Sequence, residues 1–272
     1  MEKEFKSRLI TGLLFGLSII LLILGGKYSS SLLFGLIGFL TASEYLQISG
    51  TRVKDAKFFR SLVILLLLYT AAAFTSPQDT LFLATILISL FVYLVLFWSM
   101  LVDRPLPHHR INSSFVIFYP GLSVFPAISH LQHTESHPTS LLLGFFAILW
   151  MSDSGAYFVG RKIGRHKVLP RVSPGKSWEG VIGAGITSVL VSVVISFITQ
   201  EYSLMFWITL ALVIWVSGSA GDFTESAIKR QYSIKDSGRL LPGHGGFLDR
   251  FDSLIFALPA VYLLLLIFNF LL

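Results

Sequence analysis

Residues 226–253 concentrate side chains that could bind phosphate groups and a metal ion. Gly245 and Gly246 would let backbone amides approach an anion without a Cβ in the way. Asp249 and Asp252 are three residues apart, so on a helix they would share one face. Carboxylates without soft ligands nearby suit Mg²⁺, which also binds substrate phosphates. A merely capped helix would not need the basic residues of this segment, and we therefore favour an anion site with a metal.

A second polar segment has the same character. Asp153 lies near the end of one apolar stretch, and Lys176 lies at the glycine-containing entrance of the next. Such an entrance suits an anionic group, because the helix dipole is favourable there. The Gly-Lys-Ser run lacks the spacing and the preceding strand of a P-loop, which excludes that motif. The alternative interpretation is positive charge that only anchors the loop at a membrane surface.

The rest of the chain has the composition of a membrane protein. Of its 272 residues, 54% are hydrophobic and 13% are charged, whereas about 25% are charged in a typical soluble domain. A soluble protein of this length could not bury so much apolar surface. This excludes an ordinary cytosolic enzyme, a disordered protein and a fibrous one. Because the chain has no cysteine, disulfides, Cys-based zinc sites and Cys nucleophiles are excluded as well.

Nine apolar stretches approach the length of about 20 residues that a spanning helix needs. They predict an all-α, polytopic integral membrane protein with a single domain over residues 1–272. Its N-terminal spans would occupy 1–139 and its catalytic part 140–272. The predicted spans are 9–24, 31–48, 58–75, 80–101, 111–131, 140–159, 177–199, 203–220 and 251–272.

The loops between these spans alternate in charge. Twenty of the 21 Lys and Arg residues fall on one set of loops, and Lys27 falls on the other. The positive-inside rule then predicts a cytoplasmic N-terminus and an extracytoplasmic C-terminus.

Eight acids lie at the predicted cytoplasmic face, close to the hydrocarbon, where an ionisable group is costly unless it faces a cavity or a partner. The alternative interpretation is that each acid pairs with a Lys or Arg and anchors a helix end. These acids are Glu44, Asp153, Glu179, Asp222, Glu225, Asp236, Asp249 and Asp252.

Residues 226–252 resemble the signature of CDP-diacylglycerol synthases, also called phosphatidate cytidylyltransferases. Residues 153–160 and 173–180 also resemble this family, whereas the N-terminal half is similar only in hydropathy and in the position of Glu44. The short N-terminus resembles that of bacterial members. The signature positions present are Ser226, Lys229, Arg230, Lys235, Asp236, Gly238, Pro242, His244, Gly245, Gly246, Asp249, Arg250 and Asp252.

The resemblance implies that CTP and phosphatidate react to CDP-diacylglycerol and diphosphate, with Mg²⁺ required and a second cation left open. It implies three sets of site residues. The catalytic set is Asp249, Lys229, Arg230, Lys235, His244 and Asp252. The substrate-binding set is Lys176, Ser173, Gly245, Gly246, Arg250 and Asp236. The metal ligands are Asp222, Asp249 and Asp252, with Glu225 and Asp153 as lesser candidates.

Two of the aromatic residues near these sets keep two interpretations each. His244 would donate to a phosphate or only shape a turn, because phosphatidate needs no strong general base near neutral pH. Trp178 would stack on cytosine or lie in the interfacial aromatic belt.

The expected partners are CTP, phosphatidate and the bilayer of the cell (inner) membrane, without nucleic acid, and a homodimer is left open. Two alternatives remain. A CTP-dependent polyprenol or phytol kinase resembles this family in hydropathy but lacks the full signature. A secondary transporter would place its acids near the membrane midplane, on broken helices. The gathering of the acids at one face disfavours the transporter.

Overall fold

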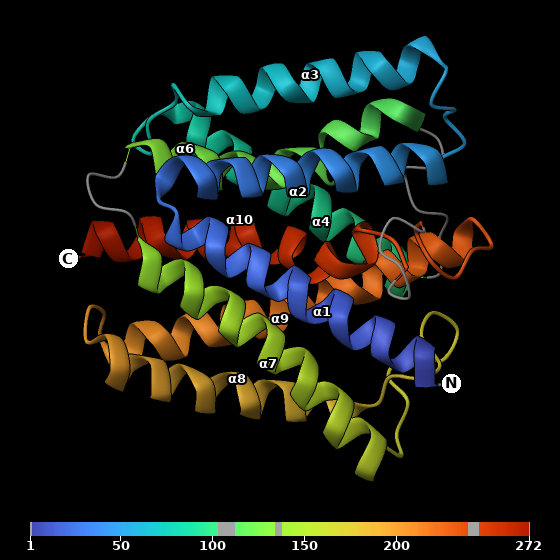
Figure 1. The fold of residues 1–272 in the computed structure, drawn as a ribbon, viewed down its shortest axis with the longest axis vertical. Coiled ribbons are helices and arrows are strands. Elements are labelled where there is room, and N and C mark those ends of the chain that lie inside the picture. Colours follow the sequence, from blue (N-terminus) through green and yellow to red (C-terminus); the bar gives the residue numbers. More distant parts are fainter. Residues whose placement is uncertain (1, 103–111, 134–137, 239–244, 272) are drawn as a thin grey trace.

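The computed structural model describes residues 2–102, 112–133, 138–238 and 245–271, and within these ranges the chain is helical without a β-strand (Figure 1). The α-helices are α1 Glu2–Leu24, α2 Lys27–Ile48, α3 Ala56–Ala72, α4 Thr80–Leu101, α6 Phe125–His133, α7 Thr139–Ile163, α8 Trp178–Thr199, α9 Leu204–Gln231 and α10 Leu248–Leu271. Two 3₁₀-helices, η1 Asn112–Ile117 and η2 Gly121–Val124, precede α6. The all-α prediction is confirmed.

Eight of the nine predicted spans correspond to one α-helix each. Seven stretches of the described chain are long and apolar enough to cross a membrane. The spans predicted at 9–24 and 58–75 correspond to shorter helical segments, the apolar part Thr11–Leu24 of α1 and the 17 residues of α3. These helices are consistent with a protein that crosses a membrane several times.

The fifth predicted span, 111–131, is not one continuous helix. The described part of this stretch consists of η1, η2 and α6. Pro120 and Pro126 explain the interruption, because proline has no amide hydrogen for an α-helical hydrogen bond. The segment still packs into the protein interior, where Tyr119 and Val124 are fully buried.

The helix α10 runs through the middle of the bundle (Figure 1) and contacts α2, α4, α6 and α9. Its residues Leu254, Ile255 and Ala257 have no exposed surface. The N-terminus and the C-terminus lie at opposite ends of the bundle (Figure 1). The described connections 49–55, 164–177 and 232–238, which belong to the basic set of loops, lie at the end where the N-terminus lies (Figure 1).

The helices α7 and α8 approach each other closely through small residues. A Cβ on Gly155 would collide with the Thr187 side chain, and one on Gly183 would collide with Val159. Small residues allow such close packing where no hydrophobic effect drives helices together in lipid. Asp153 precedes Gly155 by two residues on α7, so this packing also fixes its backbone relative to α8.

Candidate active site

A cavity of about 580 Å³ lies between α7, α8, α9 and the first turn of α10. The two polar segments identified in the sequence both contribute to it. Its described lining carries four carboxylates and three cationic side chains, an excess of one negative charge. These charged residues are Asp153, Asp222, Asp249 and Asp252, with Arg161, Lys176 and Arg250.

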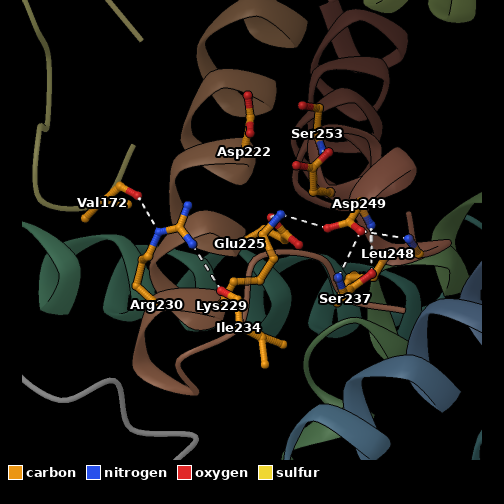
Figure 2. Close-up of polar contacts among 12 residues, drawn as sticks. Val172, Asp222, Glu225, Lys229, Arg230, Ile234, Ser237, Leu248, Asp249 and Ser253 are labelled. Carbon is orange, nitrogen blue, oxygen red and sulfur yellow. Dashed lines mark hydrogen bonds and ion pairs between the residues drawn. The ribbon is translucent and has the colours of Figure 1, made fainter. Parts of the chain in front are cut away.

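The helix α9 continues beyond the predicted span and carries a row of charged residues toward this cavity. Asp222, Glu225 and Lys229 are three and four residues apart, so they share one helix face. Lys229 Nζ lies 2.6 Å from Glu225 Oε2 and 2.7 Å from Asp249 Oδ1. Figure 2 shows the ammonium group between the two helices that carry these acids. All three side chains are nearly buried, with 13%, 1% and 9% exposure for Lys229, Glu225 and Asp249. One cation therefore compensates two buried acids.

The other oxygen of Asp249 holds the loop before α10. Oδ2 accepts hydrogen bonds from the backbone amides of Ser237 (2.9 Å) and Gly246 (2.8 Å). Gly245 has a φ of 83°, a conformation that glycine adopts without steric cost. Asp249 thus combines the predicted position at the start of α10 with a structural role, since its carboxylate is bonded to Lys229 and two amides.

The buried Glu44 of α2 anchors the same loop. Its Oε2 accepts hydrogen bonds from the Ser237 hydroxyl and from the Leu248 amide, both at 2.8 Å. Ser237 Oγ in turn accepts a bond from the Asp249 amide at 3.3 Å. These bonds satisfy two backbone amides in the first turn of α10, which have no partner within the helix. The described partners of Glu44 are thus a hydroxyl and an amide, whereas the anchoring alternative expected a Lys or Arg. The role of Ser237 was missed, because its sequence context does not distinguish it from other serines.

Lys176 and Asp222 form a more open part of the cavity. Lys176 forms an ion pair with Asp222, and the two side chains are 26% and 39% exposed. The Lys176 ammonium also lies 4.6 Å from the centre of the Phe223 ring. Asp252 is nearly buried, and its Oδ1 accepts a bond from the Ser253 amide at 2.7 Å. The more exposed side of the cavity, with Lys176 and Asp222, is the best placed to receive a ligand.

The donor chemistry of the cavity fits Mg²⁺. Within the described ranges, no three carboxylate or imidazole groups lie close enough together to hold an ion by themselves. Mg²⁺ is usually held by one or two carboxylates, with substrate phosphates and water completing its shell. The lining offers carboxylates from α7, α9 and α10 around one space. Residues of this kind could hold Mg²⁺ together with a phosphate ligand.

Several predicted site residues lie away from the cavity lining. Arg230 Nε donates to the Val172 carbonyl at 3.3 Å, and its Nη1 donates to the Ile234 carbonyl at 3.1 Å (Figure 2). These bonds hold the loops together, so the phosphate contact of Arg230 stays a prediction. Other residues outside the described lining are Lys229, Lys235, Asp236, Ser173, Gly245 and Gly246. His244 lies outside the described residues.

Two residues of the second polar segment have other surroundings than expected. Glu179 accepts bonds from the amides of Arg165 (3.1 Å) and His166 (3.3 Å), so it shapes the loop before α8. The Trp178 side chain lies on a neighbouring apolar cavity and is not part of the described charged lining. Stacking of Trp178 on a base in the charged cavity is therefore not supported.

Comparison with known sequences places the chain among nucleotide-using enzymes. The sequence model of the cytidylyltransferase family matches residues 6–268. The chain is 31% identical to a phosphatidate cytidylyltransferase of Bacillus subtilis, over 98% of this chain and 99% of that protein. It is 43% identical to a protein of the same name from Staphylococcus saprophyticus, over 50% of this chain and 53% of that protein. A further relative of that name, from Haemophilus influenzae, is 46% identical over 48% of each chain.

Replacement of Glu44 should destabilise the start of α10. Glu44→Ala leaves the Ser237 hydroxyl and the Leu248 amide buried without their acceptor, at a cost of about 1–3 kcal/mol per group. Glu44→Gln should cost less, because its carbonyl oxygen can accept both bonds. We expect Tm in detergent and turnover to fall in the order wild type, Gln, Ala. Gln47→Ala is the control, since Gln47 is exposed and bonds to the Ser43 carbonyl of its own helix. Wild-type Tm and turnover in Glu44→Ala would contradict the anchoring role.

Replacement of Lys229 and Lys176 should have different consequences. Lys229→Met leaves two buried acids without their cation, which costs about 3–5 kcal/mol, and Tm should fall strongly. Lys176→Met breaks a partly exposed pair that contributes about 0–1 kcal/mol; Tm should stay close to wild type while turnover falls. Thermal unfolding and turnover are measured on both variants. An unchanged Tm with lost turnover in Lys229→Met would show instead that Lys229 acts on the substrate.

Proposed function

The chain belongs to the cytidylyltransferase family, and from this premise we propose that it converts CTP and phosphatidate to CDP-diacylglycerol and diphosphate. The family makes the protein a nucleotidyltransferase. The observation that carries the choice of phosphatidate is the relative of that activity name, which aligns with this chain over 98% of its length. The cavity supports this choice, because it places charged groups among membrane helices, where a lipid phosphate and a nucleotide could meet.

The proposed reaction transfers a cytidylyl group from CTP to phosphatidate. An oxygen of the phosphatidate phosphate attacks the α-phosphorus of CTP, and the bond from that phosphorus to the bridging oxygen of the β-phosphate breaks. Diphosphate leaves with the electron pair. Such transfers depend mainly on positioning and on charge stabilisation. Lys176, Arg161 and Arg250 line the cavity and would orient and neutralise the phosphates.

The excess of acids over cations in the lining supports a bound cation, since phosphates would add further negative charge. One or two of the predicted ligands Asp222, Asp249 and Asp252 would hold Mg²⁺ together with the substrate phosphates. Asp153 lines the same cavity, and a second cation is compatible with the four carboxylates. When bound, Mg²⁺ would supply charge stabilisation to the phosphates. Asp249 would contribute to the Mg²⁺ site with a carboxylate that Lys229 and two backbone amides hold in place.

We further propose that the cavity faces the cytoplasm, in the cell (inner) membrane. The support is the alternation of charge, since the described connections 49–55, 164–177 and 232–238 of the basic set lie at the end of the bundle where the N-terminus lies. The positive-inside rule assigns such an end to the cytoplasm. Residues 140–272 would supply most of the catalytic part, with Glu44 as the anchor from the N-terminal spans.

The proposed reaction is tested by the fate of two labels. The purified protein in detergent micelles is supplied with Mg²⁺, phosphatidate and CTP labelled at the α- or the γ-phosphate. We expect the α-label in the lipid product and the γ-label in released diphosphate. A γ-label found in lipid when a polyprenol or phytol replaces phosphatidate would show a kinase instead. No transfer of the α-label to phosphatidate would contradict the proposed substrate.

Removal of one cavity carboxylate should weaken the Mg²⁺ dependence of this reaction. In Asp222→Asn we expect the Mg²⁺ concentration for half-maximal rate to rise about tenfold or more, as is typical when the surroundings of a bound metal are disturbed. The control is Asp55→Asn, because the Asp55 carboxylate bonds to the Arg52 amide at a loop outside the cavity. A wild-type Mg²⁺ profile in Asp222→Asn would remove Asp222 from the metal ligands.

A further inference from the structure

A second cavity of about 520 Å³ lies beside the charged one. Helices α4, α8 and α9 form most of its wall, with two residues of the loop before α8. None of the described residues that line it is charged. The volume is in the range of ordinary ligand sites, about 300–1,000 Å³. We call this cavity the apolar groove; its larger side chains include Leu90, Leu94, Phe97, Trp178, Trp215 and Val216.

The apolar groove adjoins the charged cavity. Val181, Ser219 and Phe223 line both spaces. Lys176, which lies 4.6 Å above the Phe223 ring, marks the charged side of this boundary. A molecule with its phosphate at Lys176 would therefore need to pass only the side chains that line both spaces to reach the groove.

Three polar side chains of the groove wall, those of Tyr93, Trp215 and Ser217, have partners within the protein. Trp215 Nε1 donates to the Val181 carbonyl at 2.8 Å, and Ser217 bonds to the Val213 carbonyl. The Tyr93 hydroxyl bonds to Ser123 and, at 3.2 Å, to the Ile255 carbonyl. A base or a sugar, which requires hydrogen bonds when it leaves water, finds little to bind here. A hydrocarbon chain has no such requirement.

The wall of the groove is fixed by packing. A Cβ on Gly185 of α8 would collide with the ring of Trp215 of α9. The ring therefore lies directly against α8, and its Nε1 bond to Val181 adds a second attachment. On the outer side, Leu94 and Val216 are exposed, so the groove can be reached from the surrounding lipid.

We propose that the apolar groove binds an acyl chain of the lipid substrate while the phosphate of that lipid lies in the charged cavity. This inference rests on the proposed function. The commitment to an acyl chain follows from the shared boundary of the two spaces, the lack of charge in the described lining of the groove and the access from the lipid side.

The test uses phosphatidates of increasing chain length, from dibutyryl to dipalmitoyl. Val216→Trp fills the groove beyond Phe223, so chains that end before this position should react as with wild type. For dipalmitoyl phosphatidate, kcat/KM should fall about tenfold, as expected when a well-packed site is overfilled. The KM for CTP should not change. Leu190→Trp is the matched control, because Leu190 of α8 is equally exposed to lipid but does not line the groove.

Leu94→Trp fills the groove from its opposite wall and should show the same dependence on chain length. Activity with dibutyryl phosphatidate shows that each variant is folded. An equal loss at every chain length, or no loss at any, in both variants would overturn the groove as the acyl site. A different result would contradict the proposed function itself, namely that the wild-type protein transfers no α-label to any phosphatidate.

Discussion

The start of α10 depends on hydrogen bonds that a carboxylate on a distant part of the chain accepts. The first amides of a helix have no partner within it, and when they are buried they must find one elsewhere. Glu44 supplies this partner for Leu248 directly and, through Ser237, supports the bond to Asp249. The position of α10 fixes Arg250 and Asp252 in turn. The N-terminal spans therefore help to form the charged cavity, although most of its lining comes from the C-terminal half.

A second constraint is the balance of charge in a nearly buried site. Lys229 compensates both Glu225 and Asp249, and removal of one partner from such a cluster leaves an uncompensated charge. Asp249 is therefore tightly held, whereas Asp222 has a more exposed carboxylate, paired with Lys176. Loss of charge at Asp249 would disturb the fold and the chemistry together. A substitution at Asp222 would affect the chemistry with less effect on the fold, so it is the more informative test of a metal ligand.

The sequence allowed the helices and the general place of the cavity to be predicted, because both follow from local patterns. The span 80–101 coincides with α4, where one apolar run fills the helix. The helix α9 continues to Gln231, beyond the span predicted at 203–220, and the ion pair of Glu225 with Lys229, four residues apart, suits this continuation. Partners that depend on tertiary structure were not predictable. The contact of Glu44 with Ser237 joins residues 193 positions apart, and the bonds of Arg230 to Val172 and Ile234 require two loops to meet.

The helix α9 is the common wall of two spaces with opposite chemistry. Its Asp222 lines the charged cavity and its Val216 lines the apolar groove, while Ser219 and Phe223 line both. Phosphatidate has the same division, with a charged phosphate joined through a glycerol diester to hydrocarbon chains. Because the boundary in the protein is fixed by the Trp215 contacts with α8, the depth of the lipid would be set by the rigid wall and not by the fluid bilayer. A phosphate held at a constant depth stays beside Lys176, which is what an in-line transfer to a nucleotide requires.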